Sequence, residues 1–240
     1  MTLLTVVRDV CAAVGVVMPT SVFSNITGNR TMAEMLSLAN EMAQRIAYDT
    51  RDWVKLRKTT TMVGDGTTTG FNLPADFQRM LLTSNVWLSS STLSPARFVP
   101  DTDEWLNRRT RNYSDATGEW TILGNQMLLA SAMGSGVTAY FAYLHKNCIT
   151  LATGGVGDSF LADGDSFTLG DRILKLGMIW QWKAQKGSPY QEDLNTYADA
   201  LTYLMGHDSP APIILGRSPI SSSARTAIPS QTIYVPGMIP

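Results

Sequence analysis

Hydrophobic residues recur with two different periods along this chain, and the order of these periods limits the fold more than any other feature. Apolar side chains repeat at helical spacing in residues 3–14, 31–49 and 173–204, whereas short β-branched and apolar runs typical of strands fill residues 57–150. Such segregation is typical of α+β proteins. We therefore expect an α+β fold in which N- and C-terminal segments form a helical bundle. A small antiparallel β-sandwich or barrel should be inserted between them.

A capping box marks the start of the second N-terminal helix. Thr31 and Glu34 have the spacing at which the hydroxyl and the carboxylate each satisfy one unpaired backbone amide. The helix that they open is predicted to run to about Asp49. Trp53 and Leu56 are then expected to complete this part of the core.

Two more helices are predicted near the C-terminus. The first begins near Gly170 and ends at Gly187. The second has Ser188 as a candidate cap and Pro189 in its first turn, and it is expected to end at Gly206.

Short strands separated by turn residues occupy the middle of the chain, at a spacing typical of a small sandwich or barrel. One hairpin is predicted from Lys58–Val63, the turn Gly64–Gly66 and Thr67–Phe71. A second is predicted about Gly124–Asn125, because glycine tolerates the positive φ of such turns. The other predicted elements are the strands Met80–Leu88, Ala96–Val99 and Val137–Leu144, and a short helix over Asp101–Arg109 capped by Asp101 or Thr102.

These patterns predict four consecutive parts of the chain. Residues 1–56 begin the helical bundle, residues 57–168 form the β-rich domain, and residues 169–207 complete the bundle. Residues 208–240 contain six prolines and too few apolar residues for an independent core, so an extended arm is expected. Its apolar residues are candidates for docking onto a partner: Ile213, Ile214, Leu215, Ile233, Tyr234 and Val235.

The charge content favours a protein that makes many protein contacts. Charged residues make up 16% of the 240 residues, and the formal net charge is −1, whereas average proteins have about 25% charged residues. The basic run Arg108–Arg111 stands beside Asp101, Asp103 and Glu104, so it is better interpreted as a solvated mixed-charge segment than as a phosphate-binding face. Sequence-specific DNA binding is therefore not expected.

The two cysteines and the N-terminus favour a reducing compartment. Cys11 and Cys148 are far apart and are interpreted as buried free thiols. Arg8 and Asp9 interrupt the apolar N-terminal residues, which argues against a signal peptide. No uninterrupted apolar run approaches the roughly 20 residues of a membrane span, so no membrane association is expected.

Patterns typical of metal binding are weak. His145 and His207 do not lie in a pattern with metal-ligand spacing. Asp158, Asp163 and Asp165 resemble a calcium loop only faintly, because the twelve-residue spacing and the terminal glutamate are missing. Capping of the following helix is the preferred interpretation of these aspartates.

No catalytic arrangement is evident either. The segment Gly64–Gly70 lacks the Gly-Lys-Ser/Thr ending of a phosphate loop and is interpreted as a hairpin turn. Ser/His/Asp, Cys/His and paired-carboxylate patterns are not found. We expect neither enzyme activity nor a cofactor.

The segment Phe71–Arg79 has a very particular layout. Leu73 and Phe77 flank a Pro-Ala-Asp turn in which Pro74 restricts φ and Asp76 can cap the turn that follows. We expect both apolar side chains to be buried and Arg79 to be paired or hydrogen-bonded.

Together with a second segment, residues 163–187, this turn resembles the head-to-tail adaptor proteins (head-completion or tail tubular proteins) of tailed bacteriophages. The likeness covers roughly residues 30–206. It rests on fold signatures rather than chemical ones: Leu73, Pro74, Asp76, Phe77, Arg79, Trp87, Trp120, Ile122–Gly124, Leu176, Gly177, Trp180, Trp182, Lys183 and Gly187.

The resemblance implies a structural virion protein. Proteins of this kind form a ring, usually of twelve copies, beneath the portal, and the ring extends the channel through which the DNA passes. The implied partners are the portal protein, a tail or nozzle protein and further copies of the chain. The implied location is the head–tail connector of a virion made in the cytoplasm of a bacterial host.

Two aromatic sets leave other interpretations open. Trp180, Trp182, Tyr190, Tyr197 and Tyr203 have the helical spacing of core packing, but Trp182 and Lys183 fall off the main stripe, so a subunit contact remains open there. The strand Val137–Leu144 places Tyr140 on one side and Phe141 and Tyr143 on the other. An alternative function is therefore a carbohydrate- or ligand-binding β-module of a virion or bacterial protein.

Overall fold

The computed structural model describes residues 1–82, 84–91, 93–111 and 118–208. Within them the fold is α+β, with five α-helices and three sheets, and the described strands close no barrel. Residues Met1–Asp208 form one compact unit. The predicted docking residues of the arm, from Ile213 to Val235, lie outside the described residues.

The first helix, α1 (Leu3–Val14), forms as predicted and buries its apolar face. Its first amides are satisfied by a distant loop, because Leu3 and Leu4 donate backbone hydrogen bonds to the carbonyls of Asp165 and Asp163 at 2.7 and 3.1 Å. The N-terminal end of α1 is therefore held by tertiary structure rather than by a local side-chain cap.

The second helix, α2 (Arg30–Gln44), continues into a π-helical turn, η2 (Arg45–Asp49), so the predicted end at Asp49 is confirmed. The predicted capping box is wrong. Asn29 is the N-cap, and its side chain accepts from the amides of Thr31 and Met32. Glu34 instead faces two cations and pairs with Arg30 and Lys186, so it does not turn back to the helix end. The 3₁₀ turns η1 (Phe23–Asn25) and η3 (Val54–Leu56) flank this helix.

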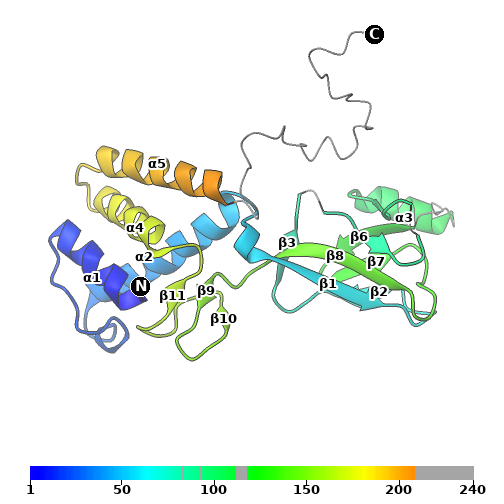
Figure 1. The fold of residues 1–240 in the computed structure, drawn as a ribbon, viewed down its shortest axis with the longest axis horizontal. Helices are drawn as coiled ribbons and strands as arrows, with labels where there is room; N and C mark the ends of the chain where they lie inside the picture. Colours follow the sequence, from blue (N-terminus) through cyan, green and yellow to red (C-terminus); the bar gives the residue numbers. More distant parts are fainter. Residues whose placement is uncertain (83, 92, 112–117, 209–240) are drawn as a thin grey trace, which may run out of the picture. The chain divides into compact units, whose positions relative to one another are not determined.

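The C-terminal helices are α4 (Asp171–Gln185) and α5 (Gln191–His207). Helix α4 contacts α1, α2 and α5, and Figure 1 shows these helices side by side. The predicted role of Ser188 as the cap of α5 is wrong. Its amide donates to the carbonyl of Lys183 at 2.9 Å, and the amide of Gly187 donates to Ala184. These bonds form a Schellman motif that ends α4, so Ser188 belongs to the preceding helix.

One core cluster gathers the side chains of α1, α2, α4 and α5. Trp53 and Leu56 are buried in it, as predicted. It also includes Leu144, Cys148, Ile149, Phe160 and Phe167. Some of these come from a small sheet in the order β10-β9-β11, formed by Val156–Gly157, Ile149–Thr150 and Ser166–Phe167.

The strand β8 (Thr138–His145) organises a four-stranded antiparallel sheet and confirms the predicted strand there. Strand β1 (Arg57–Val63) pairs with it along its whole length. The predicted hairpin between β1 and the following run is therefore wrong. Strand β2 (Gly70–Asn72) joins a different sheet, where it pairs with Gln126–Leu129. At Gly64, after the end of β1, a Cβ would collide with the main chain of Met133 and Gly134, so this close approach requires glycine.

The predicted single strand Met80–Leu88 is also wrong. Its ends lie in two short strands, β3 (Phe77–Met80) and β4 (Trp87–Leu88), which pair with different parts of β8. Between them the chain leaves the sheet, and Leu82 is exposed while its amide donates to the carboxylate of Asp52. The apolar residues of this segment therefore do not form one continuous strand paired with β8.

The second sheet has the order β2-β7-β6-β5. Strands β6 (Glu119–Leu123) and β7 (Gln126–Leu129) form the predicted hairpin about Gly124, whose φ is 61°. Strand β5 (Arg97–Phe98) runs parallel to β6. Helix α3 (Thr102–Thr110) confirms the predicted short helix, with Asp101 as its cap. Side chains of both larger sheets build a second core cluster, which includes Met62, Trp120, Met127 and Phe141.

Candidate functional sites

The turn Leu73–Arg79 is anchored mainly through Asp76. Its carboxylate accepts from the ammonium of Lys58 at 2.6 Å and from the hydroxyl of Tyr143 at 2.8 Å. Its carbonyl accepts from the amide of Lys146. The expected local cap is therefore wrong, because Asp76 bonds to β1 and β8 instead of the turn that follows it.

The apolar residues of this turn differ in exposure. Leu73 is buried as predicted, but Phe77 is only partly buried, so that part of the prediction is wrong. The Phe77 ring lies against the ring of Tyr143, with centroids 5.6 Å apart, at the rim of the core. Pro74 accepts the amide of Phe77 and closes the turn.

The environment of this turn shifts the pKa of Asp76, Tyr143 and His145. Burial raises the pKa of Asp76, but hydrogen bonds from Lys58 and Tyr143 outweigh it and leave the pKa below its ordinary value. Burial and the neighbouring carboxylate raise the pKa of Tyr143 to about 12. Burial and the charge of Lys58 lower the pKa of His145, which therefore favours its neutral form. This cluster is suited to holding strands together rather than to proton transfer at neutral pH.

Arg79 is paired, as predicted. Its guanidinium lies 2.5 Å from the carboxylate of Asp52, between the π-helical turn and η3. The same carboxylate accepts the amide of Leu82. Asp52 thus connects β3, which follows the turn, to the segment that follows α2. The spacing of residues in the sequence did not indicate Asp52 as the partner of Arg79.

Gly177 lies where α4 contacts both α2 and α5. A Cβ at this position would collide with the terminal methyl of Met42 in α2 and would lie 3.3 Å from the ring of Tyr197 in α5. The glycine therefore allows three helices to meet, and its role is in packing.

The two tryptophans of α4 serve the same packing. Trp182 is buried, so the prediction that it lies off the apolar stripe is wrong. Trp180 is partly buried, its ring centroid lies 6.0 Å from that of Tyr197, and the guanidinium of Arg45 lies over it. Lys183 pairs with Asp193 of α5 at 2.6 Å. Helix pairing accounts for these residues.

The aspartates of the loop before α4 do not cap that helix, contrary to the prediction. Asp165 is buried and accepts from the amides of Ala152, Leu161 and Ala162 at 2.7 to 2.9 Å. Asp163 accepts from the amides of Val22 and Phe23. The carboxylates therefore shape the loop whose carbonyls hold the start of α1.

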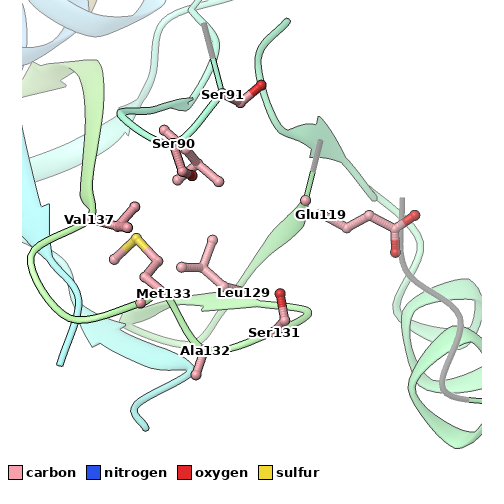
Figure 2. Close-up of a pocket in the computed structure, with 11 residues that line it drawn as sticks. Ser90, Ser91, Glu119, Leu129, Ser131, Ala132, Met133 and Val137 are labelled. Carbon is pink, nitrogen blue, oxygen red and sulfur yellow. The ribbon is translucent and has the colours of Figure 1, made fainter. Parts of the chain in front are cut away.

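A pocket of about 320 Å³ lies between the strands, and Figure 2 shows its lining. Ser90, Ser131 and Met133 are among the lining residues. Glu119 lies at the edge of the pocket, but its carboxylate points away from it and pairs with Arg108 of α3. Among the described residues that line this pocket there is no histidine.

A larger, shallow groove of about 900 Å³ lies on the outer face of the β1–β8 sheet. Trp87 and Tyr140 stand directly opposite each other on β4 and β8, and they are 45% and 49% exposed. Thr61 is opposite Tyr140 on the other side. We call this surface the threonine–aromatic groove and define it by Thr59, Thr61, Ser84, Asn85, Trp87 and Tyr140.

Other candidate chemistry is sparse in the described part of the chain. No group of three or more His, Cys, Asp or Glu side chains there is placed to hold a metal ion. Cys11 and Cys148 are free and buried, as expected, and burial raises the pKa of both thiols. Within the same residues, no helix combines the length and apolar character that crossing a membrane requires.

No protein-family model matches the chain, and no curated protein matches it.

Proposed function

We propose that this protein is a structural subunit of an adaptor ring between the portal and the tail of a tailed bacteriophage. The observation that carries the proposal is the position of the signature residues. Asp76 and Arg79 fasten the turn to β1, β8 and the segment after α2, and Gly177 lets three helices meet. These residues hold strands and helices in fixed positions, and a ring subunit needs such a rigid fold to present the same contact surfaces in every copy.

From the resemblance to the adaptor proteins we infer that two parts of the scaffold meet different partners. The N- and C-terminal helices form a bundle that meets the portal, and the strands form an inserted antiparallel sandwich that meets the next tail component. The two separate core clusters support this division, because each can keep its packing while its outer surface adapts to a different partner. The chain is not an enzyme and needs no cofactor in this role.

The ring is built from further copies of the same chain, twelve in the form that the resemblance implies. A closed ring uses heterologous interfaces, in which one face of a subunit meets a different face of the next. Exposed apolar side chains such as Val17 and Leu161, 87% and 65% exposed, provide contact surface. The formal net charge of −1 suits a channel wall that must let DNA pass without binding its phosphates tightly.

The test is native mass spectrometry and cryo-electron microscopy of the chain, alone and with a portal protein. We expect a monomer or a weak oligomer alone and a closed ring on the portal. Particles that carry a single, asymmetric copy would refute the proposal. The assembled subunit belongs to the head–tail connector of the virion after synthesis in the host cytoplasm.

A further inference from the structure

We propose that the threonine–aromatic groove is a binding site for a neutral oligosaccharide. This inference is independent of the adaptor function, because it rests on the chemistry of one sheet face. A carbohydrate-binding module requires an exposed aromatic surface, and in this groove Trp87 and Tyr140 provide one.

The register of the sheet builds the site. Met62, Ala139 and Phe141 turn to the buried side and join the strand core. The alternate residues therefore share the outer face. Thr61, Tyr140 and Trp87 form one row across three strands, and directly opposed side chains have Cβ atoms about 4.5–5.5 Å apart. The two exposed rings thus stand on neighbouring strands of one sheet face, with a threonine in the same row.

The side chains that line the groove indicate which class of ligand it can bind. None of its lining residues is charged, so it lacks the basic side chains with which proteins hold nucleic-acid phosphates. Its polar groups are threonine and serine hydroxyls and the amide of Asn85. A sugar ring presents an apolar C–H face to an aromatic ring and hydroxyls at its edge, so it matches both kinds of group.

A protein partner fits this composition less well. Contact surfaces between proteins are enriched in aromatic residues, methionine and arginine, whereas serine and alanine are depleted there and threonine is uncommon at their energetic centres. Thr60 and Ala142 also line the groove, so its lining contains three threonines, one serine and one alanine beside its aromatic residues. Its volume of about 900 Å³ lies in the range of small-molecule sites.

Saturation-transfer NMR and titration calorimetry of the full chain with maltohexaose, cellohexaose and chitohexaose test the proposal. A heparin fragment and a short single-stranded DNA serve as charged probes. We expect saturable binding of at least one neutral probe. Trp87→Ala and Tyr140→Ala should each weaken it about 3- to 10-fold, the effect of losing one aromatic contact. The control Tyr203→Ala, which removes a 64% exposed ring from α5, should leave it unchanged.

Three results would overturn the assignment: no saturable binding of any neutral probe, binding of the charged probes alone, or wild-type self-association that Trp87→Ala abolishes. The last result would assign the groove to a second copy of the chain. Thermal unfolding of each variant verifies that the fold is retained. Ring formation on the portal by Trp87→Ala, measured in parallel, separates failure of this site from failure of the adaptor function.

Discussion

Asp165 shows how one buried carboxylate can stabilise a loop by accepting hydrogen bonds from several backbone amides. Burial raises the pKa of its carboxyl, but hydrogen bonds from three backbone amides together lower the pKa by more. The pKa in the folded protein therefore lies below its ordinary value. A carboxylate with a lowered folded pKa stabilises the fold above its unfolded pKa of about 3.9. That stabilisation is lost as the pH falls through the folded pKa.

We therefore expect Asp165→Asn to lower the free energy of unfolding by about 1–3 kcal/mol at pH 7, because the amide group cannot accept from all three donors. The difference from the wild type should shrink below about pH 4. Urea unfolding at pH 7 and at pH 3 measures both values. Asp158→Asn, at an exposed position in the same loop, is the matched control. A difference that does not change with pH would contradict this role.

Gly177 provides a second prediction at the scale of a residue. Gly177→Ala gains up to about 1 kcal/mol of helix propensity but crowds the buried terminal methyl of Met42, and overpacking costs about 1–3 kcal/mol. We expect a net loss of about 1 kcal/mol, and the double variant with Met42→Leu should recover part of it. Gly206→Ala has open space around its new Cβ and is the control. Additive effects in chemical denaturation would show that the two residues do not compete for space.

At the scale of the element, the connection between α4 and α5 depends on backbone conformation. Gly187 has a φ of 69° and ends α4. A side chain in this left-handed region costs about 1–2 kcal/mol, so Gly187→Ala should destabilise the protein by about 1 kcal/mol. Ser188→Ala should change stability by less than about 0.5 kcal/mol, because only the amide of Ser188 takes part. Thermal and urea unfolding measure the stability of both variants. A larger loss of stability for Ser188→Ala than for Gly187→Ala would contradict this prediction and would assign the Ser188 side chain a capping role.

Helix α5 explains why the connection matters. Only Tyr197 and Ala200 are fully buried in it, and partly buried apolar residues such as Leu194 and Leu201 pack against the core beside the Lys183–Asp193 pair. An element with so small a buried face needs an accurate turn at its start. This is why the glycine, rather than the serine beside it, is expected to control stability.

At the scale of the whole molecule, the boundary between the compact unit and the predicted arm can be tested by truncation. Asp208 accepts the amide of Val54 at 3.0 Å and pairs with Arg51, so it is part of the compact unit. A chain ending at residue 208 should keep the thermal stability of the full chain and lose affinity for the portal, if the arm docks there. A chain ending at residue 207 should also lose about 1 kcal/mol of stability, since the Val54 amide loses its acceptor.

Thermal unfolding and portal co-sedimentation of the two truncated chains separate these roles. Unchanged portal binding by the chain ending at residue 208 would exclude docking by the arm. A collapsed fold would show that residues 209–240 belong to the core of the subunit itself.

The sequence by itself determined the elements whose signals are local. The apolar stripes of α1 and α4, the hairpin about Gly124 and the strand β8 each follow from periodicity or from one turn residue, so neighbours along the chain sufficed to predict them. The same holds for the burial of Leu73 and Trp53, which are large apolar residues within clear patterns.

Only the tertiary structure decided the pairings between distant segments. The partner of β1 is β8, some eighty residues away, and the carboxylates of Asp76 and Asp163 accept hydrogen bonds from segments far from them in the sequence. The outer row of Trp87, Tyr140 and Thr61 likewise exists only because three strands share one register. Backbone amides, strand edges and carboxylates bind whichever suitable group the packing of the cores brings near them. That choice depends on the whole chain, so spacing along the sequence could not reveal it.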